Sequence, residues 1–189
     1  MTRVYLIRHG RPSSSWGGDD LDPGLDTAGH AQARAVAERF MSMPVADRPS
    51  RVVSSPLRRC RETAEPTARA LDLPLEIDPM FGEIPTPVGL SDAERPAWLH
   101  AAFRGTWADI VGDLDYDQWR HDIASALRTY PGAAVFSHFV AINGVVSSLE
   151  GDPNVIAFRP DHTSTSAFDV TARGLTLVRR GAEAATGVV

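Results

Sequence analysis

Lysine is absent from this chain of 189 residues, so all 19 of its basic residues are arginines. Without a lysine amine the chain can form no Schiff base and can supply no P-loop lysine. The only cysteine, Cys60, has no partner for an internal disulfide, which fits a reducing cytoplasm. The net charge of −5 predicts no nucleic-acid partner. No apolar run is long enough to span a membrane, and the first predicted strand begins too early to leave room for a signal peptide.

The hydrophobic patterns predict strands that alternate with helices. We expect strands at residues 4–7, 51–54, 75–77 and 133–137, helices at 27–40, 57–71 and 139–150, two more helices between 97 and 130, and a closing hairpin over 166–178. Asp26 is expected to cap the first helix, and Pro66 is expected to kink or interrupt the second. This alternation predicts a three-layer α/β/α sandwich with a mostly parallel central sheet and helices on both faces.

The chain shows no repeat and no boundary between domains. We therefore expect one catalytic domain over residues 1–189, with about 182–189 as a flexible tail. Residues 79–96 are rich in proline and are expected to form a loop across the face of the sheet. Five aromatic residues follow in the predicted helices: Trp98, Phe103, Trp107, Tyr116 and Trp119. They could line a substrate pocket, although aromatic residues at helical spacing are more typical of a core.

Arginine, histidine and serine residues stand at three junctions between a predicted strand and the next helix. The first strand ends in Arg8 and His9, the second leads into residues 54–59 with two arginines, and the fourth ends in Ser137 and His138. In a parallel sheet these junctions lie at one edge, together with two helix N-termini that attract anions. Singly, each arginine could be a solvated surface residue and His138 could be a packed core residue. All three junctions together favour a site for a phosphate dianion.

The order of these motifs resembles that of the histidine phosphatase superfamily, the phosphoglycerate mutase-like group with an Arg-His-Gly motif. The matching features are Leu6-Ile7-Arg8-His9-Gly10, then Leu25 with Gly29 and Gln32-Ala33, then Ser54-Ser55-Pro56-Leu57-Arg58-Arg59 with Glu62-Thr63-Ala64, then Gly82-Glu83-Ile84, and Ser137-His138. No Asp follows His138, so the chain resembles the branch that lacks a His-Asp pair. The family's phosphate-binding arginine falls on Arg59 rather than on Arg58.

The resemblance implies a metal-independent mechanism that needs no cofactor. His9 would attack phosphorus and form a phosphohistidine, while Arg8, Arg59 and His138 would hold the phosphoryl oxygens. Glu83 would protonate the leaving oxygen and later deprotonate water. The neighbouring carboxyl groups Asp78, Asp92 and Glu94 are alternatives for this last role.

The chain departs from the family pattern near the predicted site. The family often has an acidic residue after Arg-His-Gly and an Asn a few positions later, where this chain has Arg11 and Ser15. Ser15 could still bind phosphate, as could Ser13 or Ser14. The residue after the second histidine is Phe139 instead of the usual Gly, which predicts an aromatic, substrate-binding ring at the mouth of the site.

These features predict a phosphomonoesterase that hydrolyses a small phosphorylated metabolite or a phosphoprotein through a phosphohistidine. Two alternatives remain open: a cofactor-dependent phosphoglycerate mutase, and a non-catalytic protein of the same fold that binds a phosphorylated ligand. The mutase is disfavoured because the longer insertions that enclose a bisphosphate are short or missing here. The sequence predicts a cytoplasmic protein without a membrane partner, and it leaves a homodimer open.

Overall fold

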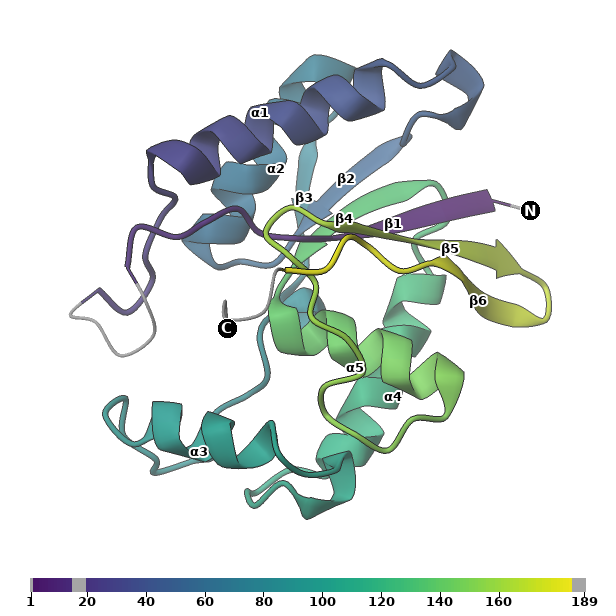
Figure 1. Ribbon diagram of the computed structural model, residues 1–189. Helices are drawn as coiled ribbons and strands as arrows, with labels where there is room; N and C mark the ends of the chain where they lie inside the picture. Colours follow the sequence, from purple (N-terminus) through teal and green to yellow (C-terminus); the bar gives the residue numbers. More distant parts are fainter. Residues whose placement is uncertain (1, 15–19, 185–189) are drawn as a thin grey trace.

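The computed structural model describes residues 2–14 and 20–184, which form a central six-stranded sheet covered by helices (Figure 1). The strands are β1 (Thr2–Arg8), β2 (Arg51–Ser54), β3 (Leu75–Ile77), β4 (Ala133–Ser137), β5 (Thr165–Thr171) and β6 (Gly174–Arg179). Their order across the sheet is β3-β2-β4-β1-β5-β6. The first four strands in this order are parallel, and β5 and β6 are antiparallel to their neighbours.

The helices lie on both faces of this sheet, as predicted (Figure 1). On one face α1 (Thr27–Met41) packs against α2 (Arg58–Leu71), and on the other α4 (Tyr116–Arg128) packs against α5 (Phe139–Glu150). A shorter helix, α3 (Arg95–Ala102), lies beyond the second pair. The fold is therefore a mostly parallel α/β/α sandwich, as predicted.

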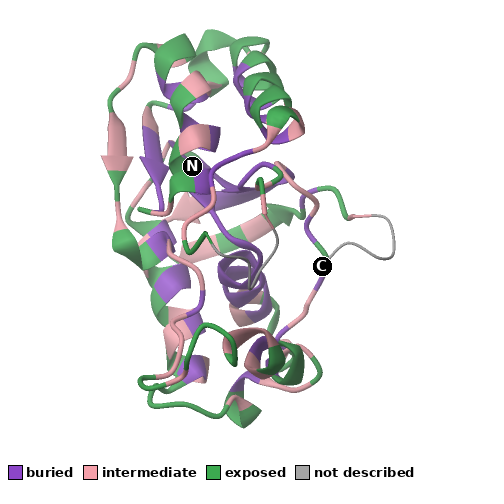
Figure 2. Cartoon of the chain, turned by 90° about the vertical axis from the view of Figure 1, so that its left-hand side faces the viewer, coloured by how far each residue is buried: buried purple, intermediate pink, exposed green. Residues whose placement is uncertain are grey.

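The strands are apolar on both sides because both faces of the sheet are covered. In β1, Val4 and Leu6 belong to the core cluster completed by α4 and α5, whereas Tyr5 and Ile7 belong to the cluster completed by α1 and α2. Successive side chains of a strand point to opposite faces, so a strand buried on both faces has a continuous apolar sequence. Figure 2 shows the buried residues gathered on the central strands and on α5.

A third apolar cluster lies between α5 and the segment that contains α3. Trp107 and Tyr116 are fully buried in it, and Trp98, Phe103 and Trp119 pack against it. Trp107 and Tyr116 are therefore core residues, as helical spacing favours, and the other three are partly buried at the edge of this cluster. The first of the two helices expected here is shorter than predicted, because α3 ends at Ala102 and is followed by a separate 3₁₀ turn at Trp107–Asp109.

The structure bears on two expectations about the ends and breaks of elements: an interruption at Pro66 and a tail from about residue 182. Helix α2 runs through Pro66 without interruption, because Thr63, Ala64, Thr67 and Ala68 on either side of the proline are buried and hold the helix in place. At the C-terminus, residues 182–184 are not a free tail: the carbonyl of Ala182 accepts a hydrogen bond from Asp161 at 2.9 Å, and Ala184 donates one to Arg159 at 2.9 Å. Residues 185–189 lie outside the described residues.

Glycines 10 and 29 allow the loop after β1 to approach α1 closely. A Cβ atom on Gly10 would lie 2.8 Å from the carbonyl oxygen of Gly29. A Cβ atom on Gly29 would in turn collide with the carbonyl oxygen of Arg11. Asp26 caps the same helix end, as predicted, by accepting a hydrogen bond from the Gly29 N–H at 2.7 Å.

We expect Gly29→Ala to destabilise the protein by about 2–3 kcal/mol, because the added methyl group must push apart two backbone segments that cannot rotate away. Gly105→Ala is the matched control: its Cβ would find its nearest neighbour at 3.5 Å, an ordinary contact. Urea unfolding of both variants measures the difference. Equal free energies of unfolding in the two variants would contradict the prediction.

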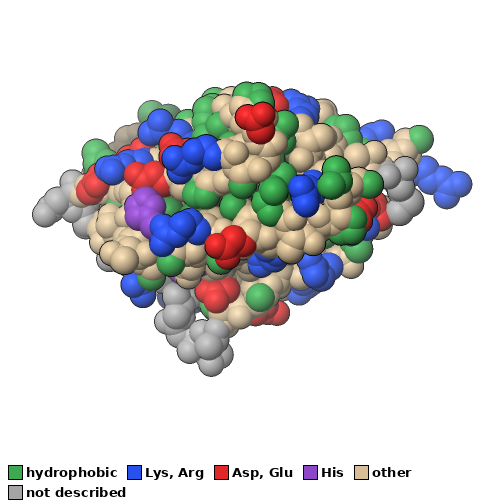
Figure 3. Space-filling model, turned by 90° about the horizontal axis from the view of Figure 1, so that it is seen from above, with side chains coloured by type: hydrophobic (Ala, Val, Ile, Leu, Met, Phe, Trp, Pro, Cys, Tyr) green, Lys and Arg blue, Asp and Glu red, His purple; other side chains and the backbone are tan. Residues whose placement is uncertain are grey.

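The surface seen from above in Figure 3 carries basic and acidic side chains interspersed with apolar ones, without a large patch of one sign. Within the part of the chain that the structure describes, no helix is both long and apolar enough to cross a bilayer.

Candidate active site

The sheet order brings the three strand-to-helix junctions together. Strands β2, β4 and β1 are consecutive neighbours, so their carboxyl ends lie side by side. The rings of His9, after β1, and His138, after β4, have centroids 5.3 Å apart. Arg59, from the first turn of α2, reaches the same point. The predicted convergence of two histidines and arginines at one sheet edge is what the structure contains.

His9 is 3 % exposed, and its hydrogen bonds define which ring nitrogen carries the proton. Its Nδ1 lies 2.8 Å from the carbonyl oxygen of Gly10. A carbonyl oxygen only accepts, so Nδ1 is the protonated nitrogen and Nε2 carries the lone pair. Burial, followed by the charges of Arg59 and Arg8, lowers the pKa of His9 well below 6.5. At neutral pH His9 is therefore an uncharged ring with a lone pair on Nε2, the form in which imidazole is a nucleophile.

The two arginines that begin α2 have different surroundings. The Arg58 side chain is 56 % exposed and pairs with Glu62 at 2.7 Å. The Arg59 side chain is 8 % exposed, and its Nε donates to Nε2 of His9 at 3.3 Å. Of this pair, only Arg59 lies at the junction of the three strands.

Arg8 is buried between an aromatic ring and a carbonyl group. Its Cζ lies 5.0 Å from the centroid of the Phe139 ring, and one terminal nitrogen donates to the carbonyl oxygen of Pro160 at 2.9 Å. Its Nε is buried and has no partner among the described residues. Burial lowers the pKa of Arg8 to about 10, so the side chain is still a cation at neutral pH. A buried cationic N–H without an acceptor is costly unless a ligand supplies one.

Phe139 does not lie at the mouth of the site, so that expectation is wrong. The residue is 2 % exposed, and its ring packs against Phe103 with centroids 5.9 Å apart. The first residues of α5 are buried because the third apolar cluster covers them. Phe139 therefore lies beneath the Arg8 guanidinium and supports it.

Glu83 places a buried carboxyl group at the N-terminus of α5. Its Oε1 accepts hydrogen bonds from the N–H groups of Ile84 at 3.0 Å and Val140 at 3.2 Å. Its Oε2 is buried without a partner among the described residues. Burial raises the pKa of Glu83, and the Ile84 N–H and the charge of Arg59 oppose that rise. The group thus keeps a proton at a pH where an exposed carboxyl group has lost it.

The three competing carboxyl groups are engaged elsewhere or exposed. Asp78 accepts a hydrogen bond from the Tyr130 hydroxyl at 2.7 Å, and Glu94 accepts one from the Ser91 hydroxyl at 2.6 Å. Asp92 is exposed.

His138 is fully buried beside two side chains from the second junction. Its Nε2 lies 2.8 Å from the Ser55 hydroxyl and 3.3 Å from the Cys60 sulfur. Burial and the charge of Arg59 lower the pKa of His138 well below 6.5, so the ring is neutral at pH 7. Burial also raises the pKa of the Cys60 thiol, which keeps it protonated and unreactive.

The two helix N-termini are less open than predicted. The Arg58 N–H donates to the carboxylate of Asp22 at 2.9 Å, and the Val140 N–H donates to Glu83. These two N–H groups are therefore already occupied by side-chain carboxyl groups of the chain itself. Of the three serines considered for phosphate binding, Ser14 has a buried hydroxyl without a partner among the described residues, whereas Ser15 lies outside them.

One residue that the sequence analysis missed also lies here. The ring of His162 is centred 5.7 Å from that of His9, and its Nδ1 lies 3.3 Å from the His9 carbonyl oxygen. Burial and the charge of Arg8 lower its pKa to about 4. Its only signal in the sequence is a lone histidine in the loop before the last hairpin, and such a histidine gives no indication of its neighbours.

The neutral, buried histidines make the fold sensitive to acid. Because the folded-state pKa values of His9 and His138 are lowered, the unfolded chain binds more protons below pH 6.5. Stability is therefore lost as the pH falls below about 6.5, by about 1.4 kcal/mol per pH unit for each fully buried histidine. The raised pKa of Glu83 acts in the opposite direction.

We expect His9→Ala to reduce this slope by about 1.4 kcal/mol per pH unit. His100→Ala, which removes an imidazole at an exposed position, is the control. Urea unfolding at several pH values between about 7 and 5 measures the slope. Equal slopes in wild type and His9→Ala would show that His9 is not a buried neutral group.

The arrangement can bind and attack a tetrahedral oxyanion. Two guanidinium groups and two neutral imidazoles surround a nucleophilic nitrogen, and the buried carboxyl group of Glu83, with its raised pKa, lies nearby. Over residues 2–14 and 20–184, no group of three or more His, Cys, Asp or Glu residues is placed to hold a metal ion.

Known proteins share both the sequence pattern and the fold. The family model of the histidine phosphatase superfamily (branch 1) matches residues 4–183. Among curated relatives, the probable phosphoglycerate mutase GpmB of Enterobacter sp. (strain 638) is 27 % identical over 172 residues, which cover 81 % of this chain and 77 % of the relative. The protein of the same name from Escherichia fergusonii is 28 % identical, with the same coverage.

Solved structures of phosphatases superpose on the whole chain. A phosphoserine phosphatase from Entamoeba histolytica, in complex with 3-phosphoglyceric acid, has a TM-score of 0.76 at 20 % identity and covers 96 % of this chain and 98 % of its own. A mycobacterial glucosyl-3-phosphoglycerate phosphatase has a TM-score of 0.72 at 20 % identity, covering 96 % and 99 %. At this identity they show a shared fold. The family match covers residues 4–183, and the fold brings the strand that ends in Arg-His-Gly next to the second histidine. The chain therefore belongs to branch 1 of the histidine phosphatase superfamily.

Proposed function

We propose that this protein is a metal-independent phosphomonoesterase that hydrolyses a small phosphorylated metabolite or a phosphoprotein through a phosphohistidine on His9. The observation that carries the proposal is the lone pair on His9 Nε2. The hydrogen bond from Nδ1 to the Gly10 carbonyl leaves that lone pair on Nε2, and Nε2 faces the Arg59 guanidinium. The unpartnered Arg8 Nε and Glu83 Oε2 support it, because a bound phosphate ester would give both atoms a partner.

In the first step His9 Nε2 attacks phosphorus, and the bond from phosphorus to the leaving oxygen breaks. Glu83 gives its proton to that oxygen, and Arg8, Arg59 and His138 hold the phosphoryl oxygens. In the second step Glu83 takes a proton from water, whose oxygen attacks phosphorus as the phosphorus–nitrogen bond breaks. The balance is one ester and one water to one alcohol and one inorganic phosphate.

The test is hydrolysis of an aryl phosphate with excess chelator, combined with acid and base treatment of the trapped phosphoenzyme. Phosphohistidine is stable in base and labile in acid, whereas a phosphoserine ester survives acid. Turnover that resists the chelator, with an acid-labile and base-stable phosphoenzyme, is the expected result. Loss of turnover with the chelator, or an acid-stable phosphoenzyme, would overturn the proposal.

A phosphoglycerate mutase is the second candidate, because the relatives from Enterobacter and Escherichia are named as such. A mutase must keep water away from the phosphohistidine and return the phosphoryl group to a bound product. Incubation with 3-phosphoglycerate and a bisphosphate primer separates the two: a phosphatase releases inorganic phosphate, and a mutase forms 2-phosphoglycerate instead. Tight phosphate binding without either product would indicate the non-catalytic alternative.

A further inference from the structure

His162 is the third imidazole beside the proposed phosphate site, and the mechanism above gives it no task. Its ring lies 5.7 Å from the nucleophilic ring, nearly as close as the 5.3 Å of His138. It is also the most solvent-accessible of the three, since His9 and His138 are buried and His162 is half-buried. His162 is therefore the one imidazole of the three with a part of its surface open to solvent.

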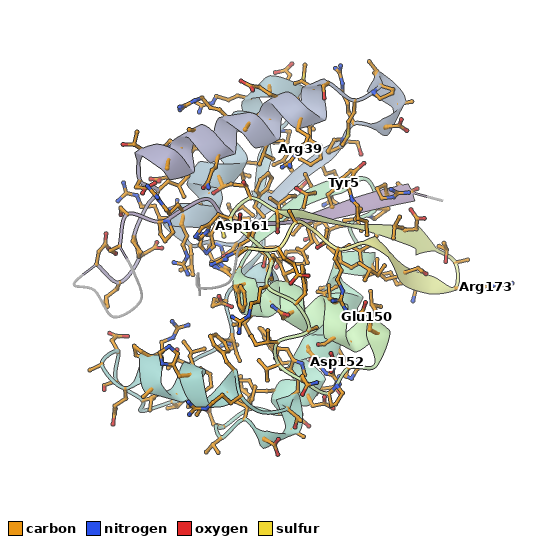
Figure 4. The ribbon with its side chains drawn as sticks, viewed as in Figure 1. Tyr5, Arg39, Glu150, Asp152, Asp161 and Arg173 are labelled. Carbon is orange, nitrogen blue, oxygen red and sulfur yellow. The ribbon has the colours of Figure 1, made fainter. Side chains whose placement is uncertain are left out.

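The loop that carries His162 is held from several directions. Thr163 donates from its N–H to the carbonyl of Arg8 at 3.1 Å, and its own carbonyl accepts from Arg39 at 3.1 Å. Asp161, which precedes His162, donates its backbone N–H to the carbonyl of Ala182 in the C-terminal segment. Figure 4 shows Asp161 near the end of the sheet where β1 finishes, below Arg39 on α1. The position of His162 is thus determined by β1, α1 and the C-terminus together.

The backbone beside His162 is strained. Thr163 has φ of +58°, in the left-handed region that β-branched residues avoid. Such a conformation costs on the order of 1–3 kcal/mol and persists only where its surroundings determine it. Strain of this kind clusters at sites that bind a ligand.

The hydrogen bond to His9 determines which nitrogen of His162 is available. Nδ1 faces a carbonyl oxygen, which only accepts, so Nδ1 carries the proton of the neutral ring. Nε2 then has the lone pair, and among the described residues it makes no hydrogen bond. A phosphoryl dianion presents only acceptor oxygens, so while Nδ1 keeps its proton on the His9 carbonyl, the dianion can contact Nε2 only through an added proton.

We propose that His162 contacts the bound phosphoryl group through Nε2 and shares one proton with a phosphoryl oxygen, so that phosphate binding takes up one proton. The proton comes from solvent, and no covalent bond forms or breaks. The inference rests on the proposed function, since it requires that a phosphoryl group binds beside His9.

The charges around His162 agree with uptake of a proton only when the anion is present. In the free protein, burial and the cations Arg8 and Arg11 lower its pKa to about 4, against the opposing Asp161 and the His9 carbonyl. A bound dianion reverses the sign of the nearest charge and so favours the protonated ring.

The test measures the dissociation constant of inorganic phosphate between about pH 8 and pH 6 in wild type and two variants. In His162→Asn the amide can still donate to the His9 carbonyl but has nothing at the position of Nε2. In His162→Gln the amide reaches the position of Nε2 but cannot titrate. His100→Asn, at an exposed position on α3, is the control. Thermal unfolding verifies that each protein is folded.

The ratio of the variant's dissociation constant to that of wild type is expected to rise by up to about tenfold per pH unit as the pH falls, for both variants. A ratio that does not change with pH would overturn the inference. Phosphate binding by His162→Asn as tight as that of wild type would also overturn it, because His162 would then act only by donating a hydrogen bond to the His9 carbonyl. Phosphate binding with the expected ratio but without ester turnover would overturn the proposed function alone. Absence of phosphate binding in wild type would overturn both.

Discussion

Replacing His9 with alanine is expected to lower kcat for an aryl phosphate by about four to six orders of magnitude, the loss that follows removal of a covalent nucleophile. The structure explains why His138 and Cys60 cannot take over. His138 is buried against Ser55 and Cys60, and the Cys60 thiol stays protonated. The variant should form no acid-labile phosphoenzyme.

The same variant should still bind inorganic phosphate, because Arg8, Arg59 and His138 remain. Phosphate binding measured by calorimetry therefore distinguishes a lost nucleophile from a lost site, and His100→Ala controls for loss of an imidazole elsewhere. A His9→Ala protein that keeps more than about a hundredth of wild-type turnover would show that another group attacks phosphorus.

Replacing Glu83 with glutamine is expected to affect two kinds of substrate differently. An alkyl phosphate needs a proton on its leaving oxygen, so its hydrolysis should fall by about 10²- to 10⁴-fold. An activated aryl phosphate needs no such proton, so its first step should continue while hydrolysis of the phosphohistidine slows. The expected result is a burst of phenol close to one equivalent of enzyme, followed by slow turnover, with phosphoenzyme accumulating.

The pH dependence of alkyl phosphate hydrolysis follows from the same carboxyl group. Burial raises the pKa of Glu83, so the rate should fall as the pH rises through that value and the acid loses its proton. In Glu83→Gln this alkaline limb should disappear. The matched control is Glu94→Gln, which makes the same change in a carboxyl group that accepts a hydrogen bond from the Ser91 hydroxyl. A burst in the control, or none in Glu83→Gln, would show that another residue handles the proton.

The fold and the convergence of side chains at one sheet edge could be predicted because they depend on local patterns. The run Val4–Ile7 is apolar on both faces and so indicates a doubly covered strand. Once β1, β2 and β4 are parallel neighbours, the residues at their ends must meet, and Arg8, His9 and His138 do.

The errors lie where tertiary contacts decide the outcome. The place of Phe139 directly after His138 predicts a ring at the mouth of the site, but burial of the start of α5 encloses it. His162 is brought to His9 by a loop held by Arg39 and Ala182, residues far away in the sequence. No local pattern records such a contact. In the sequence, residues 182–184 resemble a tail because their backbone hydrogen bonds are made to an irregular loop, and such contacts leave no periodic pattern.

The order of strands in the sheet has a consequence for synthesis of the chain. β1 is the first strand to be made, yet its neighbours are β4 and β5, which come from the last third of the sequence. Until β4 leaves the ribosome, the apolar residues Val4 to Ile7 have no strand with which to pair. A nascent chain halted before residue 133 would therefore expose an unpaired apolar strand and be prone to aggregate, whatever its catalytic residues.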